Sequence, residues 1–139
     1  MPRILVVDDD ADIRELLRDG LEESGFGVIA VSDGADALDQ LPDAGVDLIL
    51  LDLIMPRARI DGLGFLAELS TRAELKNIPV AILSGIGEIV TDALDPHTAR
   101  TLRICSVIKK PIGLDSLVRT VRDILKLSDG DDAESPSPD

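Results

Sequence analysis

The chain has 139 residues, the size of one ordinary domain. Its 14 basic and 27 acidic residues give a net charge of −13, which argues against a nucleic-acid-binding surface, because such surfaces need clustered Lys and Arg. The acidic residues are 20 Asp and only 7 Glu, and aspartate favours loops, helix caps and ion sites. We therefore expect a site built from aspartates.

The apolar residues are sufficient for a core, which must be aliphatic. Hydrophobic residues make up 45% of the chain, but the aromatic residues are two Phe, with no Trp or Tyr. The single cysteine, Cys105, excludes an internal disulfide and a cysteine-rich zinc site. Because Asp8 ends the apolar run at the N-terminus, neither a signal peptide nor a membrane span is expected. We expect a cytoplasmic protein.

The first part of the chain predicts a strand, a helix and a second strand. Arg3–Val7 is a short β-branched run of strand length. Apolar residues then recur at helical spacing over Ile13–Leu21, and Gly25 ends this pattern. Phe26–Val31 is a second, weaker strand pattern.

The middle of the chain repeats this alternation. Val46–Leu51 and Ile78–Leu83 are continuous apolar runs, and the helical spacing of Leu63–Leu69 lies between them. Runs that are apolar on both faces are typical of buried parallel strands.

The last part predicts two more helices and one strand. An Asp-Pro pair at 95 and 96 indicates a helix over 96–102, Ile104–Ile108 a strand, and Leu114–Leu125 the clearest helix of the chain. Ser128–Asp139 contains five acids, no base and no large apolar residue, so we expect a disordered acidic tail.

Alternating strands and helices predict an α/β fold with a parallel sheet and helices on both faces. Such a sheet binds its ligand beyond the carboxyl ends of its strands, so the residues that follow each strand are the candidate site residues. These residues are Asp8 and Asp9 after the first strand, Asp52 after the third, Ser84 after the fourth, and Lys109, Lys110 and Pro111 after the fifth.

This set of groups indicates phosphoryl chemistry. Converging carboxylates repel one another unless a cation lies among them, and oxygen ligands without His or Cys suit Mg²⁺ or Mn²⁺. A carboxylate beside such an ion can attack a phosphoryl group, while an ammonium group neutralises charge and a hydroxyl donates a hydrogen bond. The product would be an acyl phosphate.

From Arg3 to about Leu127 the chain resembles the response regulator receiver domains of two-component signalling. The matching stretches are ILVVDDD, DLILLDLIMP, the DG pair at 61 and 62, IPVAILSG, and the KP pair at 110 and 111. The resemblance implies a CheY-like, flavodoxin-like doubly wound sandwich of five strand–helix units with strand order 2-1-3-4-5. It also implies a stand-alone receiver domain over 1–127, followed by the tail.

The resemblance further implies the roles of the acidic residues. Asp52 is expected to be the phosphoacceptor. Asp8 and Asp9 are expected to hold Mg²⁺ together with Asp52 and the main-chain carbonyl of Ile54.

On the other side of the site, the resemblance makes Ser84 the switch hydroxyl and Lys110 a phosphate contact, and it places a cis peptide bond before Pro111. The family's signalling aromatic is replaced by Val107. Its ring movement is therefore not available, and we expect residues 85–102 to rearrange on signalling instead.

Structural interpretations compete with some of these roles. Asp10 is predicted to cap the first helix, and Asp8, Asp9 and Asp52 could be cap or turn residues as well. Ser84 lies in a common Ser-Gly turn pair, and Lys109 or Lys110 could be a solvated surface charge. His97 is interpreted as a surface residue.

The loop after Asp52 is longer than the family pattern, with five residues at 57–61 where three are usual. Arg57 and Arg59 lie on it and could contact phosphate or a partner, but we favour two solvated arginines. In addition, the resemblance places Ile54 and Ile86 at positions where polar residues of the family can orient the hydrolytic water, and their apolar side chains predict slow self-dephosphorylation.

The favoured function is a switch that accepts a phosphoryl group from a sensor histidine kinase or a phosphotransfer protein and signals through an unknown downstream protein, as a monomer or weak dimer. It is not a dedicated turnover enzyme. The alternative is a degenerate receiver that acts as a constitutive interaction module. An aspartate-based phosphohydrolase would need an acid at Ile54, and a flavin protein would need Tyr or Trp to stack on the ring.

Overall fold

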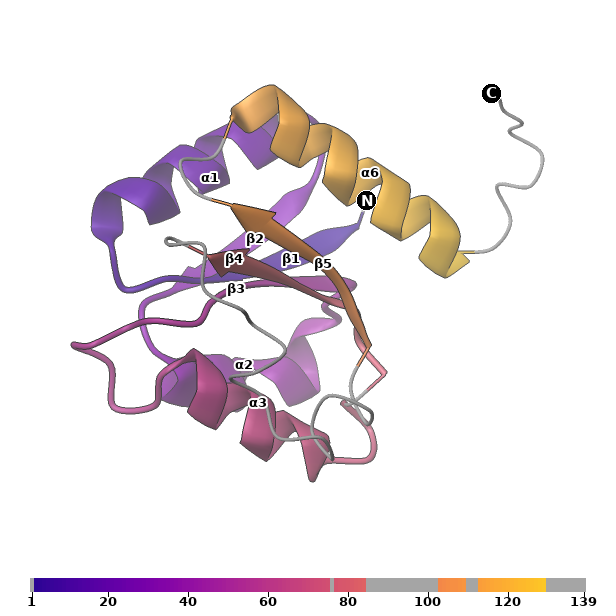
Figure 1. Ribbon diagram of the computed structural model, residues 1–139. Helices are drawn as coiled ribbons and strands as arrows, with labels where there is room; N and C mark the ends of the chain where they lie inside the picture. The colour runs from indigo at the N-terminus through magenta and orange to yellow at the C-terminus, as the bar shows by residue number, and fades with distance from the viewer. Residues whose placement is uncertain (1, 76, 85–102, 110–112, 130–139) are drawn as a thin grey trace.

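The computed structural model describes residues 2–75, 77–84, 103–109 and 113–129 (Figure 1). Each predicted strand is present, with ends that differ by at most two residues from the expected bounds. The elements are β1 (Arg3–Val7), α1 (Ala11–Glu23), β2 (Gly27–Val31), α2 (Gly34–Ala44), β3 (Leu48–Asp52), α3 (Gly62–Ser70), β4 (Val80–Ser84), β5 (Ile104–Lys109) and α6 (Leu114–Asp129).

The five strands form one parallel sheet in the order β2-β1-β3-β4-β5, which confirms the predicted fold class and strand order. The register places Val7 beside Val31 and Leu51, so β1, β2 and β3 end at the same edge. Asp52 pairs with Leu83 in the same way. The central strands β1, β3 and β4 are apolar on both faces because helices cover both sides of the sheet.

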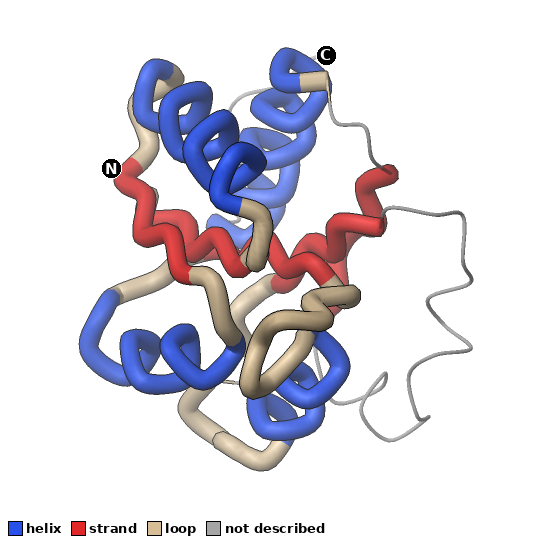
Figure 2. The backbone as a smooth tube through the Cα atoms, turned by 90° about the vertical axis from the view of Figure 1, so that its left-hand side faces the viewer, coloured by secondary structure: helices blue, strands red, loops and turns tan. Residues whose placement is uncertain are grey.

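The helices form two layers, one on each face of the sheet. In Figure 1, α1 and α6 lie above the sheet and α2 and α3 below it, and Figure 2 shows the strands between the same two layers. One buried cluster joins Val6 of β1 to Leu17 of α1 and Val121 of α6. The other joins Leu51 of β3 to Phe65 of α3. The two clusters use alternate residues of the same strands, as the pleat requires.

Aspartates cap three of the helices, which accounts for part of the excess of Asp over Glu. Asp10 precedes α1 and accepts hydrogen bonds from the backbone N–H groups of Asp12 and Ile13, as predicted. Asp33 caps α2 and Asp61 caps α3 in the same way. A carboxylate at this position satisfies free N–H groups and interacts favourably with the helix dipole.

The end of α1 agrees with the expectation, whereas the end of α6 differs from it. Gly25 has a φ of 97° and follows the end of α1, as the sequence predicts for a glycine after a helix. The helix α6 continues to Asp129, past the predicted domain end at Leu127, because backbone hydrogen bonding can extend a helix beyond its apolar face.

Some predictions fall outside the described residues. They concern the helix over 96–102, the rearrangement of residues 85–102, the cis peptide bond before Pro111, and residues 130–139 of the acidic tail. Over the ranges that the structure does describe, no helix is long and apolar enough to cross a membrane.

Candidate metal and phosphoacceptor site

Three aspartates converge at the carboxyl ends of β1 and β3. One carboxylate oxygen from each of Asp8, Asp9 and Asp52 lies within 4.8 Å of the other two. The side chain of Asp8 is fully buried, Asp52 is only 6% exposed, and the side chain of Asp9 is 10% exposed. The structure thus brings together the three acidic residues that the sequence predicted to meet.

Backbone groups hold the first carboxylate in place. Asp8 continues the ladder of β1 by donating its N–H to the carbonyl of Val31 at 3.1 Å. Its Oδ1 accepts a hydrogen bond from the N–H of Asp10 at 2.9 Å, and its carbonyl accepts one from the guanidinium of Arg14 at 2.8 Å. These bonds fix the position of Asp8 at the end of β1.

Asp52 is the last residue of β3, and the chain turns sharply after it. Its Oδ1 accepts a hydrogen bond from the N–H of Ile54 at 3.2 Å. The N–H of Gly62 donates a hydrogen bond to the carbonyl of Leu53 at 3.2 Å, which brings the start of α3 against the end of β3. A Cβ atom at Gly62 would lie 2.4 Å from the carbonyl oxygen of Asp52, so this approach requires glycine.

The donor set fits a hard divalent cation. The cluster offers carboxylate oxygens without nitrogen or sulfur ligands among its three members, and Mg²⁺ or Mn²⁺ prefers such oxygens. Two of its carboxylates are buried, and a bound cation would offset their mutual repulsion. Ile54, whose carbonyl is the expected fourth protein ligand, lies two residues after Asp52, and its side chain is exposed.

The other predicted site residues are placed only in part. Ser84 and Lys109 are the last residues of β4 and β5 and pair with each other in the sheet. Lys110, Pro111 and Ile86 lie outside the described residues. Val107 pairs with Ile82 and is 47% exposed, so an apolar side chain faces solvent at the position where the resemblance led us to expect a signalling aromatic.

Arg57 and Arg59 are solvent-exposed, as predicted, but both also form ion pairs within the chain, which the sequence did not predict. The Nε of Arg57 lies 3.6 Å from Oδ2 of Asp9, and its guanidinium donates to the carbonyl of Asp9 at 3.3 Å. The guanidinium of Arg59 lies 3.6 Å from Asp33 and 3.2 Å from Asp36. Both side chains remain largely exposed, but neither is free in solvent.

Asp33 is a structural residue of this region that sequence reasoning missed. It accepts hydrogen bonds from the N–H groups of Ala35, Arg59 and Ile60 at 2.9, 2.6 and 3.1 Å. Burial acts to raise the pKa of Asp33, but the three hydrogen bonds and the charge of Arg59 outweigh it and lower this pKa below its ordinary value. The available signal was a Ser-Asp-Gly stretch directly after a strand, which is a helix-cap pattern.

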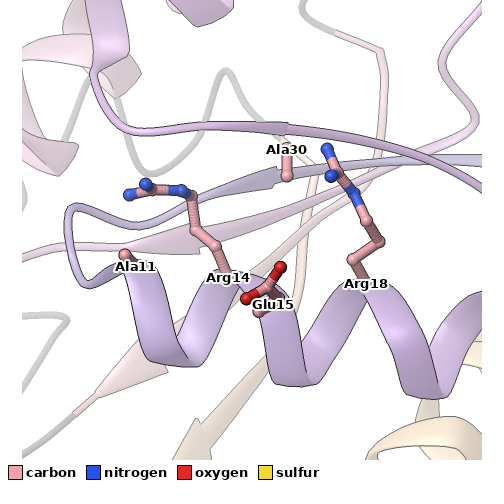
Figure 3. Close-up of a pocket in the computed structure, with 5 residues that line it drawn as sticks. All are labelled: Ala11, Arg14, Glu15, Arg18 and Ala30. Atoms are coloured by element: carbon pink, nitrogen blue, oxygen red, sulfur yellow. The ribbon is translucent and has the colours of Figure 1, made fainter.

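A hollow of about 300 Å³ lies beside the site, between α1 and the edge strand β2. Figure 3 shows Arg14 and Arg18 rising from α1 toward the strand that carries Ala30, with Glu15 between them. The lining of the hollow lacks the aspartates of the cluster, so the hollow is not the acidic site.

Comparison with known proteins agrees with this geometry. A family model described as the response regulator receiver domain matches residues 4–122. The transcriptional regulatory protein CpxR of Escherichia coli (strain K12) is 37% identical over 128 residues, which cover 92% of this chain and 51% of CpxR. This chain therefore spans about half the length of the curated relatives that it matches.

Solved receiver domains share the fold. The receiver domain of NtrX from Brucella abortus is 33% identical with a TM-score of 0.73, and the match covers 88% of this chain and 98% of that one. The receiver domain of the Francisella response regulator 1452 is 27% identical with a TM-score of 0.76, covering 92% and 99% of the two chains. This chain belongs to the response regulator receiver domain family, whose members accept phosphoryl groups in two-component signalling.

Proposed function

We propose that this chain is a phosphorylation-dependent signalling switch in which Asp52 accepts the phosphoryl group. The observation that carries the proposal is the position of Asp52. It is a nearly buried carboxylate at the end of β3, with an oxygen within 4.8 Å of oxygens of Asp8 and Asp9. The site lies where open α/β sheets bind ligands, at the carboxyl ends of their strands.

The proposed reaction is a phosphoryl transfer from a phosphohistidine. An oxygen of Asp52 attacks phosphorus, the P–N bond of the donor breaks, the imidazole keeps the electron pair, and an acyl phosphate results. Asp8, Asp9, Asp52 and the carbonyl of Ile54 would hold Mg²⁺ or Mn²⁺, which supplies positive charge next to the transferred oxygens when bound.

Ser84 and Lys110 complete the proposed site. By the family pattern, the hydroxyl of Ser84 and the ammonium of Lys110 contact the phosphoryl oxygens, and Pro111 follows a cis peptide bond. Their support is their sequence position: β4 and β5 end beside each other at this edge of the sheet, with Ser84 paired to Lys109. Movement of the Ser84 hydroxyl toward the phosphoryl group would then alter the surface that partners bind.

We infer a sensor histidine kinase or a phosphotransfer protein as the donor and a downstream protein as the receiver of the signal. The net charge of −13 supports protein contact rather than direct contact of this domain with nucleic acid. We propose a receiver domain over 1–127, with α6 extending past it to Asp129 and an acidic tail after the helix. We also propose a monomer or weak dimer in the cytoplasm, which suits the free thiol of Cys105.

The test is phosphoryl labelling by a small acyl phosphate in the presence of Mg²⁺. We expect the wild type to gain the mass of one phosphoryl group, and we expect no gain for Asp52→Asn or without Mg²⁺. Asp61→Asn is the matched control, since Asp61 is the last residue of the same loop but caps α3, and this variant should be labelled normally. Labelling of Asp52→Asn would contradict the proposal.

The exposed Val107 favours one alternative, a receiver that binds its partner without phosphorylation. A pull-down with wild type and Asp52→Asn, each with and without a phosphoryl mimic, separates the two functions. If the chain is a switch, the captured partner should differ only in the arm that combines the wild type with the mimic. A constitutive module captures the same partner in every arm.

A further inference from the structure

The side chain of Arg57 occupies the outer side of the acidic cluster. Its Nε lies 3.6 Å from Oδ2 of Asp9, its guanidinium donates to the carbonyl of Asp9 at 3.3 Å, and its backbone N–H donates to Oδ2 at 3.4 Å. Arg57 therefore holds Asp9 with both its main chain and its cationic side chain. The cation comes from the lengthened part of the loop and not from a strand of the sheet.

The loop that carries Arg57 is also hydrogen-bonded to the start of α2, which holds Arg57 next to the cluster. The N–H groups of Arg59 and Ile60 donate to the buried carboxylate of Asp33, and the N–H of Gly34 donates to the carbonyl of Ile60 at 2.9 Å. The backbone around Arg57 is thereby fixed, while its side chain is 74% exposed. An exposed side chain on a fixed backbone can leave Asp9 without disturbing the core.

We propose that Arg57 is an internal counter-cation of the metal site, which a divalent cation must displace from Asp9 before this carboxylate can serve the metal. The inference rests on the proposed function, in which Asp9 is a metal-site residue. Two cations compete for one carboxylate, so the ion pair lowers the affinity for Mg²⁺ and makes the position of the Arg57 side chain depend on metal occupancy. Arg57 acts through Asp9 and is a positioning residue.

The test compares three variants that each remove one positive charge. Arg57→Gln breaks the pair with Asp9. Arg59→Gln removes a charge from the same loop, where it pairs with Asp33, and Arg72→Gln removes one that pairs with Glu68 at 3.8 Å. Calorimetric titration of each with MgCl₂ at constant ionic strength should show about threefold tighter binding for Arg57→Gln than for either control, the effect expected for an exposed ion pair.

A second readout follows the side chain itself. In the wild type, the NMR signal of the Arg57 Nε–H should move toward that of a solvated arginine as Mg²⁺ is added, with the same midpoint as the calorimetric titration. Persistence of the original signal at saturating Mg²⁺ would overturn the inference. So would equal affinities of Arg57→Gln and Arg59→Gln, which would show an effect of net charge alone, or weaker binding by Arg57→Gln.

The failure of the proposed function looks different. If Asp52→Asn binds Mg²⁺ as the wild type does, or if the wild type and all arginine variants fail to bind it, the acidic cluster is not the metal site and both proposals fall. If the wild type and the controls bind Mg²⁺ and Asp52→Asn does not, the metal site holds. The affinity of Arg57→Gln then decides the role of Arg57 alone.

Discussion

Gly62 packs against the turn after Asp52 so closely that no side chain fits at this position. A methyl group there would lie 2.4 Å from both the carbonyl oxygen of Asp52 and the Cα of Leu53, and backbone atoms cannot yield as a flexible side chain can. We expect Gly62→Ala to lower the free energy of unfolding by about 3 kcal/mol or more, measured by urea denaturation.

Gly64→Ala is the control for this change, because it lies in the same helix and its added methyl would meet the side chain of Ile60 at 3.1 Å. Its effect should stay within about 1 kcal/mol, since the helix propensity of Ala offsets the tighter contact. Equal stability of Gly62→Ala and the wild type would show that the turn after Asp52 adapts to a side chain.

Ile54 is predicted to affect the lifetime of the proposed phosphorylated state. It follows Asp52, the proposed acceptor, by two residues, and its apolar side chain is 56% exposed next to the cluster. A polar side chain there could hold the attacking water, so we expect Ile54→Gln to speed loss of the phosphoryl group roughly tenfold, less than a dedicated general base achieves. The decay of labelled protein after removal of the donor measures this.

Leu63→Gln makes the same chemical change at another exposed apolar residue, on α3. This control should decay at the wild-type rate. Similar acceleration in both variants would indicate a general loosening of the loop, and no acceleration in Ile54→Gln would remove Ile54 from the account of phosphoryl lifetime.

At the scale of elements, the sequence could predict each strand and the site residue that directly follows it. The strands were recognisable because they are short and apolar on both faces, and parallel strands bring their carboxyl ends to one edge, so Asp8, Asp9 and Asp52 had to meet. The cap at Asp10 was predictable for the same reason, since a local pattern specifies it.

Contacts between two loops were not predictable in this way. Asp33 and Arg59 are 26 residues apart and meet only because the loops after β2 and β3 lie at the same edge of the sheet. No sequence period links them, and the pairing depends on the exact course of the longer loop. The same holds for Arg57 and Asp9, so the arginines could be recognised as charged but not assigned their partners.

The contribution of the contacts between these two loops to stability can be tested by substituting Asp33. Asp33→Asn loses the ion pair with Arg59 and the charge-assisted hydrogen bonds from the backbone, so we expect a loss of about 1–2 kcal/mol at pH 7 in urea denaturation. Asp36→Asn, which removes the exposed partner of Arg59, should cost less than about 1 kcal/mol.

The contribution of Asp33 should also depend on pH. Because folding lowers the pKa of Asp33, its ionised form stabilises the fold at pH values above the ordinary carboxyl pKa of about 4, and this stabilisation is lost as the pH falls through the lower folded pKa. The difference in stability between wild type and Asp33→Asn should shrink below pH 4. A difference that stays constant down to pH 3 would argue against an ionised Asp33 in the fold.

For the whole molecule, the well-packed core offsets the charge repulsion among the carboxylates at the carboxyl ends of the strands. Two aliphatic clusters bury both faces of the sheet, while the chain carries a net charge of −13 and places three carboxylates together at the strand ends. Like charges at such distances oppose folding, and a ligand that binds only the folded site stabilises it by mass action. Stability should therefore report on occupancy of the site.

The expected result is a rise in melting temperature with Mg²⁺ that depends on the cluster. A free Mg²⁺ concentration of about 100 times Kd adds about 2.7 kcal/mol, which corresponds to roughly 5–10 °C for a domain of this size. NaCl of equal ionic strength must be the reference, because any salt screens the repulsion within so acidic a chain. Asp8→Asn should lose the Mg²⁺-specific rise, whereas Asp39→Asn, which removes an exposed charge on α2, should keep it. An equal rise in both variants would mean that Mg²⁺ acts on the net charge of the molecule and not on the site at the end of β1.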